Sequence, residues 1–197
     1  LQMYNSGYDN SYKILPKRAS GYDKWNLIYQ NTSYMDMSIP YAAGALYSTV
    51  EDLALWDQAL HTDKLLSASS KAILFTPYKN GYAYGWGVGK IQAGRLKDSV
   101  EVMAHQGAVN GFKTSIIRIP TNKQLVVLLD NTGSSNLSTI QTNIIKILYN
   151  QPFDLPKVSV AYILGYAIQN NSLADALNQF EQIKKNPAYD LNEQDIN

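Results

Sequence analysis

The chain has 197 residues, 45% hydrophobic and 17% charged, which fits one globular domain with a small appendage. Its 17 basic and 16 acidic residues give a net charge of +1 without a basic stripe, so nothing favours a nucleic-acid partner. Cysteine is absent and the two histidines lie far apart, which excludes disulfides and thiolate metal sites and offers no zinc spacing.

The chain opens on a long irregular segment. Residues 1–40 are rich in Tyr, Asn, Ser and Asp and keep no regular period, which predicts loops with one short strand near residues 19–25. A segment this long packs against the remainder of a compact domain, so its tyrosines are expected to lie on the surface of that remainder. Because the chain begins at Leu1, with neither an initiator methionine nor a signal peptide, we expect a piece of a longer protein.

Two helices are expected next. Ser48-Thr49-Val50-Glu51 has the pattern of a capping box, and apolar residues after it share one helical face. A second helix is expected over residues 67–75, closed by Thr76-Pro77. His61 ends the first helix, where attraction to the negative end of the helix dipole explains it without a function.

A run of strands follows. Over residues 82–89 large side chains alternate with Ala or Gly, which predicts a strand with one bare face rather than a nucleotide-binding loop, since no helix pattern opens after it. Strands are predicted over 100–106, 112–119 and 124–130, and their short links indicate antiparallel neighbours. With a helix over 136–149, the fold class is α+β: an antiparallel sheet with flanking helices.

The C-terminal part changes character. A helix over 158–168, a turn at Asn170-Asn171 and a second capping box from Ser172 to Asp175 predict a helical hairpin that Pro187 ends. It partly resembles a tetratricopeptide repeat, and a single repeat cannot bury its own face, so it should dock on the main domain or begin a longer array. We therefore divide the chain into residues 1–152 and 153–197.

The most informative motif lies around His105. This histidine ends an apolar, β-branched run, and Gly107 follows two residues later. A strand ending in His-x-Gly can place an imidazole and bare backbone amides at the rim of a pocket, where they suit an oxyanion or a carboxylate. Gly107 leaves the strand edge open to a substrate chain, and Gln106 and Asn110 are further candidate contacts. The plainer alternatives are a structural histidine and, for Asn110, an ordinary Asn-Gly turn.

Several segments together resemble the class C β-lactamase-related serine hydrolases, in the right order over roughly residues 1–150. They are residues 41–56, 65–67, 82–88, 105–112 and 129–131. The resemblance implies a partial β-lactamase/transpeptidase-like fold and an acyl-enzyme mechanism without a cofactor or metal.

The resemblance also implies roles for particular residues. In this family a Ser-x-x-Lys supplies the nucleophile and its base, a Tyr-x-Asn assists, and a Lys-Thr-Gly or His-x-Gly lines the opposite wall. Only the third motif is present, as His105-Gln106-Gly107, because no lysine has a serine three positions earlier. The amide of Ala108 matches one oxyanion-hole donor, and such a donor is typically worth ~10²–10³ in rate. The three Tyr-x-Asn matches, at 8–10, 29–31 and 78–80, are expected by chance and are not carried over.

These observations predict that the parent protein is a serine hydrolase acting on a small-molecule or peptide substrate, an esterase or D-peptidase rather than a dedicated β-lactamase. The isolated chain should be inactive. The alternative is a non-catalytic module whose C-terminal helices bind a partner protein, and a proteolytic fragment that self-associates through exposed apolar surface is a third hypothesis. No stretch is long enough to span a bilayer, and an extracytoplasmic location is favoured from the resemblance alone.

Overall fold

The computed structural model describes residues 1–25, 28–92, 99–153 and 160–185. Contacts within the chain divide it into a larger unit, residues 1–24 and 30–153, and a second unit, residues 25–29 and 154–197. Helices and antiparallel strands are both present, so the fold is α+β, as the sequence predicts.

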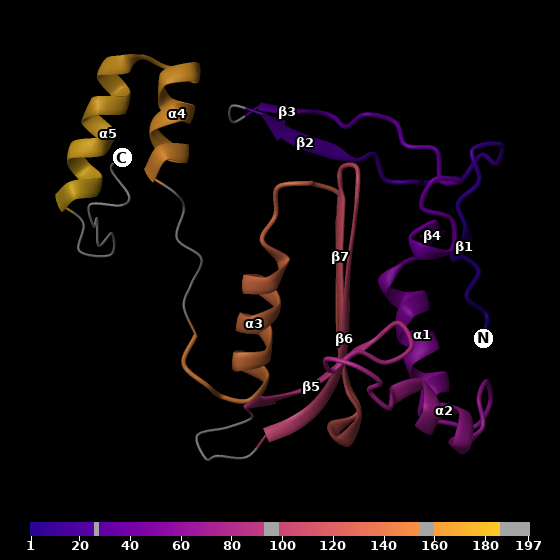
Figure 1. Cartoon of the computed structure of the whole chain (residues 1–197). Coiled ribbons are helices and arrows are strands. Elements are labelled where there is room, and N and C mark those ends of the chain that lie inside the picture. Colours follow the sequence, from indigo (N-terminus) through magenta and orange to yellow (C-terminus); the bar gives the residue numbers. More distant parts are fainter. Residues whose placement is uncertain (26–27, 93–98, 154–159, 186–197) are drawn as a thin grey trace. The chain divides into compact units, whose positions relative to one another are not determined.

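A four-stranded antiparallel sheet forms the centre of the larger unit. Its strands are β5 (Gly87–Gln92), β6 (Ser99–Val109), β7 (Phe112–Ile119) and β8 (Gln124–Asp130), in that spatial order (Figure 1). Gly111, with a φ of 70°, allows the two-residue turn between β6 and β7. The short helix η2 (Pro120–Asn122) joins β7 to β8, and these predicted strands are confirmed.

Helix α3 (Leu137–Leu148) covers one face of the sheet. Asn136 begins it by accepting a hydrogen bond from the amide of Thr139 at 3.2 Å. The apolar core under the helix is made of Val102, Ile117, Ile119 and Val126, with Ile144, Ile145 and Tyr149 packed against them. Of the predicted apolar stripe only Ile144 packs here. Ile140, Ile147 and Leu148 are exposed, so the predicted burial of this helix face is wrong for most of its residues.

Helices α1 (Val50–Leu60) and α2 (Ala68–Phe75) lie on the other side of β6 and β7 (Figure 1). Trp56 of α1 stacks on Trp86, with ring centroids 5.7 Å apart, so both tryptophans serve packing. The Arg118 guanidinium lies over the rings of Phe75 and Trp86. This second core joins both helices to the sheet.

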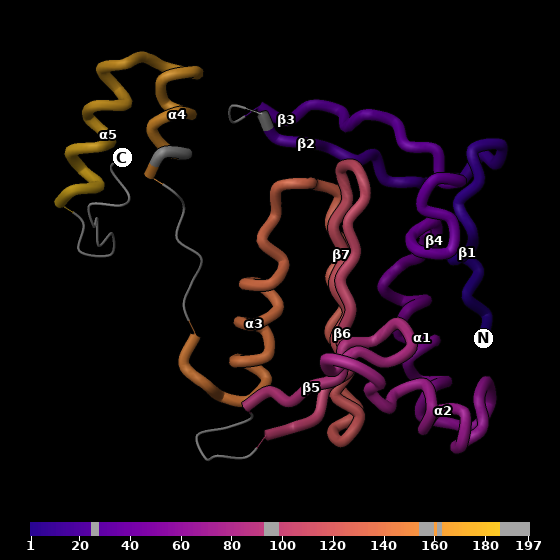
Figure 2. Tube along the Cα trace, viewed as in Figure 1, coloured from indigo at the N-terminus to yellow at the C-terminus, as the bar shows by residue number. Residues whose placement is uncertain are grey.

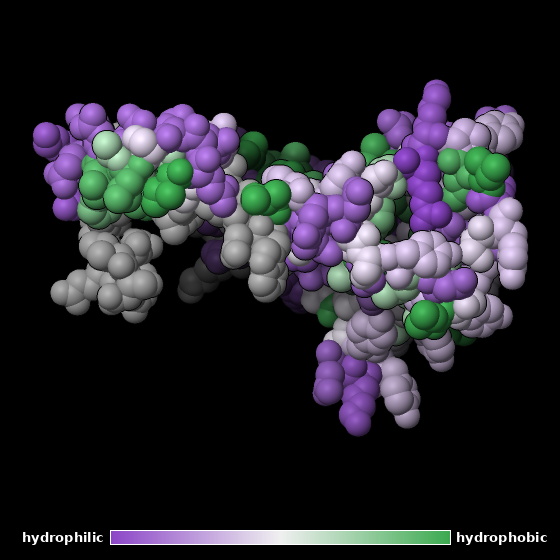
Figure 3. Space-filling model, turned by 90° about the horizontal axis from the view of Figure 1, so that it is seen from above, coloured by the Kyte–Doolittle hydropathy of each residue, from purple (hydrophilic) through white to green (hydrophobic). Residues whose placement is uncertain are grey.

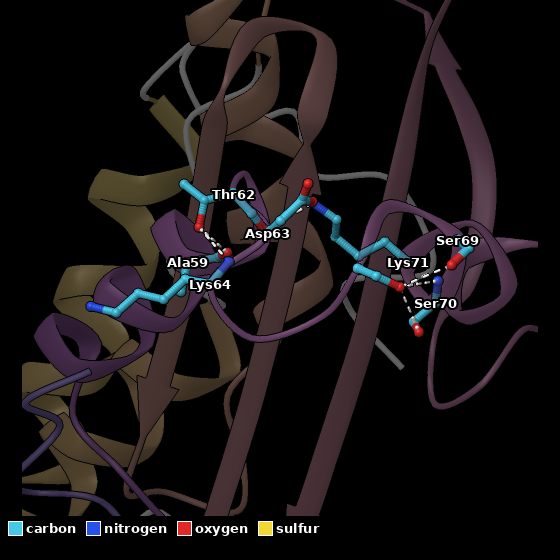
Figure 4. A network of polar contacts seen from close by, with 8 residues as sticks. Ala59, Thr62, Asp63, Lys64, Ser69, Ser70 and Lys71 are labelled. Atoms are coloured by element: carbon cyan, nitrogen blue, oxygen red, sulfur yellow. Dashed lines mark hydrogen bonds and ion pairs between the residues drawn. The ribbon is translucent and has the colours of Figure 1, made fainter.

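Polar contacts fix the link between α1 and α2 (Figure 4). The ammonium of Lys71 donates to the carbonyl of Thr62 at 2.9 Å and pairs with Asp63 at 2.8 Å. The Ser67 hydroxyl begins α2 by accepting from the amide of Ser70 at 3.2 Å. The predicted second helix is confirmed.

The first helix begins one residue later than the predicted capping box requires. Its N-cap is Thr49, whose hydroxyl accepts from the amide of Asp52 at 3.3 Å. The carboxylate of Asp52 accepts from the amide of Asn5 at 2.8 Å and from the hydroxyl of Ser6 at 2.7 Å. Asp52 therefore holds the N-terminal segment on α1, beside the short pair β1 (Gly7–Tyr8) and β4 (Leu46–Tyr47).

The strand predicted over residues 82–89 is wrong in its first half, because β5 begins only at Gly87. Gly81 and Gly85 have φ angles of 74° and 76°, which an extended strand does not contain. The amide of Ala83 donates to the carbonyl of Trp86 at 2.7 Å, so these residues form a turn.

Most of the described part of residues 1–40 is irregular, as predicted. Strands β2 (Tyr22–Trp25) and β3 (Ile28–Asn31) pair with each other (Figure 2). The segment η1 (Tyr41–Ala43) is a single 3-10 turn. The amide of Tyr22 donates to the carbonyl of Asn131 at 2.9 Å, which ties this segment to the end of β8. Several tyrosines here are exposed, Tyr12 by 95%.

The second unit contains the predicted helical hairpin, with α4 (Val160–Asn170) and α5 (Leu173–Lys185). Ser172 caps α5: its hydroxyl accepts from the amide of Asp175 at 3.1 Å and donates to the Asp175 carboxylate at 2.8 Å. Ala176 and Ile183 are buried, whereas Leu173 and Leu177 are exposed. The space-filling view shows apolar residues gathered on the surface of these helices (Figure 3). Pro187 lies outside the described residues, and the tetratricopeptide likeness stays a prediction. No helix in the described part of the chain has the length and apolar character of a membrane span.

Candidate active site

The His-x-Gly motif lies on β6 where this strand extends past its neighbour. The pairing of β5 with β6 ends at Gly87 opposite Ala104. The pairing of β6 with β7 continues to Val109 opposite Phe112. Among the described residues no strand pairs with residues 105–109 on the β5 side, so the motif lies at a free strand edge.

The direction of the backbone groups at this edge follows from the ladder. The amide of Val88 donates to the carbonyl of Gly81 at 2.7 Å and therefore points away from β6. Hydrogen-bonded and non-bonded pairs alternate in an antiparallel ladder, so Ala104 pairs toward β5, and Gln106 and Ala108 direct their amides and carbonyls to the same side. In the described part of the chain no strand covers that side beyond β5, which leaves two amides and two carbonyls outside the ladder and available to an extended ligand.

His105 is exposed on the α1 face of the sheet, opposite to the face that α3 covers, because side chains alternate along the strand. Its Nε2 atom lies 2.7 Å from the hydroxyl of Tyr82, and the two rings meet edge to face with centroids 5.9 Å apart. Tyr82 comes from the turn before β5. This contact fixes the orientation of the imidazole, and the sequence analysis does not predict it.

Packing against the neighbouring strand also favours glycine at position 107, besides its place at the free strand edge. A Cβ atom at this position would lie 2.6 Å from the Thr114 hydroxyl oxygen on the neighbouring strand. That distance is shorter than any ordinary contact, so Thr114 would have to move. Glycine thus leaves room for the Thr114 hydroxyl on the neighbouring strand.

A groove of about 540 Å³ adjoins the motif on the α3 side. It is lined by Gln106, Gly107, Ala108, Lys113, Thr114, Ser134, Ser135, Asn136, Leu137 and Ser138. The Gln106 amide donates to the Ser138 hydroxyl at 3.1 Å, and Lys113 donates to the carbonyl of Ser135 at 2.9 Å. The groove therefore brings three of the expected site residues, 106–108, together with the first turn of α3.

The other candidate residues lie elsewhere. Asn110 is not part of the groove lining; its side-chain amide donates to the carbonyl and the hydroxyl of Ser33 at 3.2 and 3.0 Å. It holds the segment after β3 against the tip of the β6–β7 hairpin. The Nε2 atom of His61 lies 3.4 Å from the buried carboxylate of Asp57. This carboxylate is a second structural reason for His61, besides its place at the end of the helix.

Sequence reasoning missed Tyr82, Lys113 and the serines before α3. One signal was available for Lys113. A two-residue turn at Asn110-Gly111 places residue 113 opposite Ala108. The serines have no local signal, because only the tertiary fold brings residues 134–138 beside β6.

Comparisons with known proteins show the family to which the chain belongs. The Beta-lactamase family matches residues 1–150. Penicillin-binding protein 4* of Bacillus subtilis (strain 168) is 26% identical over 162 residues, which cover 71% of this chain and 35% of that protein. The octameric penicillin-binding protein homologue from Pyrococcus abyssi superposes with a TM-score of 0.57 at 23% identity, over 82% of this chain and 38% of that one. The chain thus spans about a third of the length of these relatives, and it belongs to the Beta-lactamase family.

Proposed function

We propose that the whole protein is a serine hydrolase that forms an acyl-enzyme with an ester, a peptide amide or a β-lactam, and that this chain supplies one wall of its active site. Residues 1–152 would be the C-terminal half of the hydrolase domain, and residues 153–197 a helical extension. The observation that carries the proposal is the free edge of residues 105–109, directly beside the groove.

In this proposal the substrate lies along the free edge of β6. The amide of Ala108, which the ladder turns outward, donates to the developing oxyanion. His105, oriented by Tyr82 at 2.7 Å, donates to a carbonyl or carboxylate of the substrate. Gln106 contacts the substrate from the groove side, and Asn110 shapes the end of the hairpin. An esterase or a D-peptidase fits a histidine in the third motif better than a dedicated β-lactamase does.

The nucleophile and its base must come from a part of the protein outside these 197 residues, because no Ser-x-x-Lys occurs in them. A serine hydrolase without its nucleophile retains only weak catalysis. The isolated chain should therefore be inactive. On the family resemblance, we also propose that the protein works outside the cytoplasm.

The test compares the full gene product with this chain, using p-nitrophenyl acetate and a chromogenic cephalosporin. We expect turnover of at least one substrate by the full protein and none by the chain alone. His105→Ala in the full protein should lower kcat/KM roughly 10²-fold, the cost of one active-site donor. His61→Ala removes the other imidazole, away from the groove, and should leave kcat/KM unchanged. Turnover by the isolated chain contradicts the proposal, as does full activity of His105→Ala.

A second candidate is a non-catalytic module that binds a protein through its C-terminal helices. The exposed side chains of Leu173 and Leu177, 63% and 58% accessible, favour it. The residues that precede this chain in the gene decide between the two functions: a Ser-x-x-Lys followed by a Tyr-x-Asn supports the hydrolase. Homo-oligomers are a related proposal, since one relative is described as octameric, and light scattering on the chain tests it.

A further inference from the structure

A closed loop near the N-terminus, residues 9–18, holds two apolar side chains out in solvent. Its ends are joined because the buried carboxylate of Asp9 pairs with the guanidinium of Arg18, with N–O distances of 2.7 and 3.0 Å. The amide of Asp9 donates to the carbonyl of Ala45 at 2.8 Å, which anchors the loop beside the start of β4. A compact surface loop with joined ends is an Ω-loop, and such loops frequently carry a function.

Hydrogen bonds within the loop order its outer turn. The side-chain oxygen of Asn10 accepts from the amide of Tyr12 at 2.9 Å, and the carbonyl of Asn10 accepts from the amide of Lys13 at 2.9 Å. Tyr12 and Ile14 are nevertheless 95% and 91% exposed. Removing such side chains from water is favourable. An ordered turn that holds both of them in solvent therefore offers a surface that a partner can cover.

The loop also carries an excess of positive charge. Its net charge is +2, against +1 for the whole chain, and Asp9 already neutralises Arg18. The remaining charges are those of Lys13 and Lys17. The ammonium of Lys13 donates to the neutral hydroxyl of Tyr47 at 3.4 Å. In the described part of the chain neither lysine forms an ion pair, so both charges are available next to the exposed apolar side chains.

We propose that residues 9–18 form a contact loop for the surface of an anionic lipid bilayer. The side chain of Ile14 enters the boundary between headgroups and acyl chains, and the amphipathic ring of Tyr12 lies at the level of the headgroups. The ammonium groups of Lys13 and Lys17 contact the lipid phosphates, while their aliphatic stems lie along the apolar layer. This contact does not depend on the hydrolase function proposed above.

The shape of the loop favours a bilayer over a protein partner. A stable protein interface covers about 800 Å² on each side, whereas the loop offers two protruding apolar side chains, Tyr12 and Ile14, separated by a lysine. A bilayer accepts isolated protruding side chains because it needs no complementary shape. The free lysines favour anionic over neutral lipid, and Asp36, which the Ser11 hydroxyl contacts, offsets at most one of their charges.

Sedimentation with lipid vesicles tests the contact on the full protein and on the 197-residue chain. The vesicles are phosphatidylcholine alone or an equal mixture with phosphatidylglycerol. We expect both proteins to bind the mixed vesicles about tenfold more tightly, since each lysine near an anionic surface contributes about fivefold. Binding by the chain but not by the full protein would show that another part of the protein covers the loop, and it overturns the proposal. Binding to polyglutamate but not to vesicles would indicate an acidic protein partner and overturns it too.

A double substitution tests the apolar side chains. Tyr12→Ser together with Ile14→Ser should weaken binding to the mixed vesicles by about tenfold or more, the typical worth of burying one such side chain. Ile73→Ser together with Tyr78→Ser makes the same changes outside the loop, at positions that are 62% and 93% exposed, and should leave binding unchanged. All four side chains are exposed, so both variants should fold. Unchanged binding by the loop variant, or an equal loss in the control, contradicts the proposal.

A second pair of substitutions tests the charges. Lys13→Gln together with Lys17→Gln should lower the affinity for mixed vesicles about tenfold and leave the affinity for neutral vesicles unchanged. Lys90→Gln together with Lys123→Gln removes the same charge from exposed positions outside the loop and should have no comparable effect. Equal losses in the two variants would show that the vesicles respond to the net charge of the protein, and they overturn the assignment to this loop.

Discussion

Arg118 of β7 donates a hydrogen bond to the carboxylate of Asp57 in α1, and the two buried side chains join the helix to the sheet. Arg118 is 2% exposed and Asp57 is 5% exposed, so solvent cannot replace either partner. Because Arg118 stands opposite Met103 on the face that carries His105, this pair also sets the position of β6 against α1.

Loss of this pair should destabilise the chain strongly. Asp57→Asn removes the negative charge but keeps the size of the side chain, leaving Arg118 buried without a counter-charge, which typically costs about 3–5 kcal/mol. Urea denaturation followed by circular dichroism measures the change. Asp63→Asn is the matched control, since Asp63 pairs with Lys71 at a side-chain exposure of 69% and should cost roughly 0–1 kcal/mol. Similar losses in both variants would contradict the account.

A side chain at position 107 should disturb the end of β6 through one contact. Gly107→Ala places its Cβ against the hydroxyl of Thr114, at 2.6 Å before relaxation. Relieving such an overlap typically costs about 1–3 kcal/mol. In a Thr114→Ala background the same change should be nearly neutral, so a double-mutant cycle on unfolding free energies should give a coupling of about 1 kcal/mol. Additive effects would show that Gly107 is needed for another reason.

Much of the fold could be predicted from local patterns. The helices carry their own start signals, such as Ser67 and Asn136, and Asn110-Gly111 marks the tight turn between the two longest strands. These signals act within a few residues, so a sequence reading detects them. Strand β1 could not be predicted in this way, because its two residues are extended only through pairing with Leu46 and Tyr47.

The candidate site also has a part that local sequence patterns predict and a part that depends on the tertiary fold. The His105-Gln106-Gly107 motif is readable because it is contiguous in the sequence. The groove is not, since it forms where β6, the start of β7 and residues 134–138 meet in space. The strand prediction over residues 82–86 is wrong for a related reason: alternation of large and small residues does not reveal that Gly85 has a positive φ angle.

Ser115 offers a test of buried polarity beneath α3. Its hydroxyl is buried, and among the described residues it has no hydrogen-bond partner. An unpaired buried hydroxyl is unfavourable, so Ser115→Ala should leave the free energy of unfolding unchanged or raise it by up to about 1 kcal/mol. Ser138→Ala removes a hydroxyl that accepts from Gln106 and should instead cost about 0.5–1.5 kcal/mol. A clear loss of stability in Ser115→Ala would indicate a partner for that hydroxyl.

Asp36 should titrate below the usual range for aspartate. A hydrogen bond from the Ser38 side chain, followed by one from the Ser38 amide at 2.8 Å, lowers the pKa of its carboxyl. Because the folded pKa is the lower one, the stabilisation is present above the unfolded pKa and is lost as pH falls through the folded pKa. NMR titration should show the pKa of Asp36 rising in Ser38→Ala. It should rise less in Ser11→Ala, because Ser11 makes the smallest contribution.

The hydroxyl of Tyr82 should matter for activity and little for stability. Tyr82→Phe keeps the ring against His105 but removes the 2.7 Å hydrogen bond that orients the imidazole. In the full protein we expect kcat/KM to fall about tenfold, since a misdirected donor stabilises the transition state less. The free energy of unfolding should change by less than about 1 kcal/mol, because Tyr82 is 48% exposed.

Two comparisons separate an orienting role from a general effect of the substitution. Tyr84 is 66% exposed, and its hydroxyl has no partner among the described residues. Tyr84→Phe removes this neighbouring hydroxyl and should leave kcat/KM unchanged. Adding Tyr82→Phe to His105→Ala should cause no further loss, because Tyr82 acts through the imidazole. Independent losses in the double variant would show that Tyr82 contacts the substrate itself. An effect of Tyr84→Phe as large as that of Tyr82→Phe would contradict the role of Tyr82 in orienting the imidazole of His105.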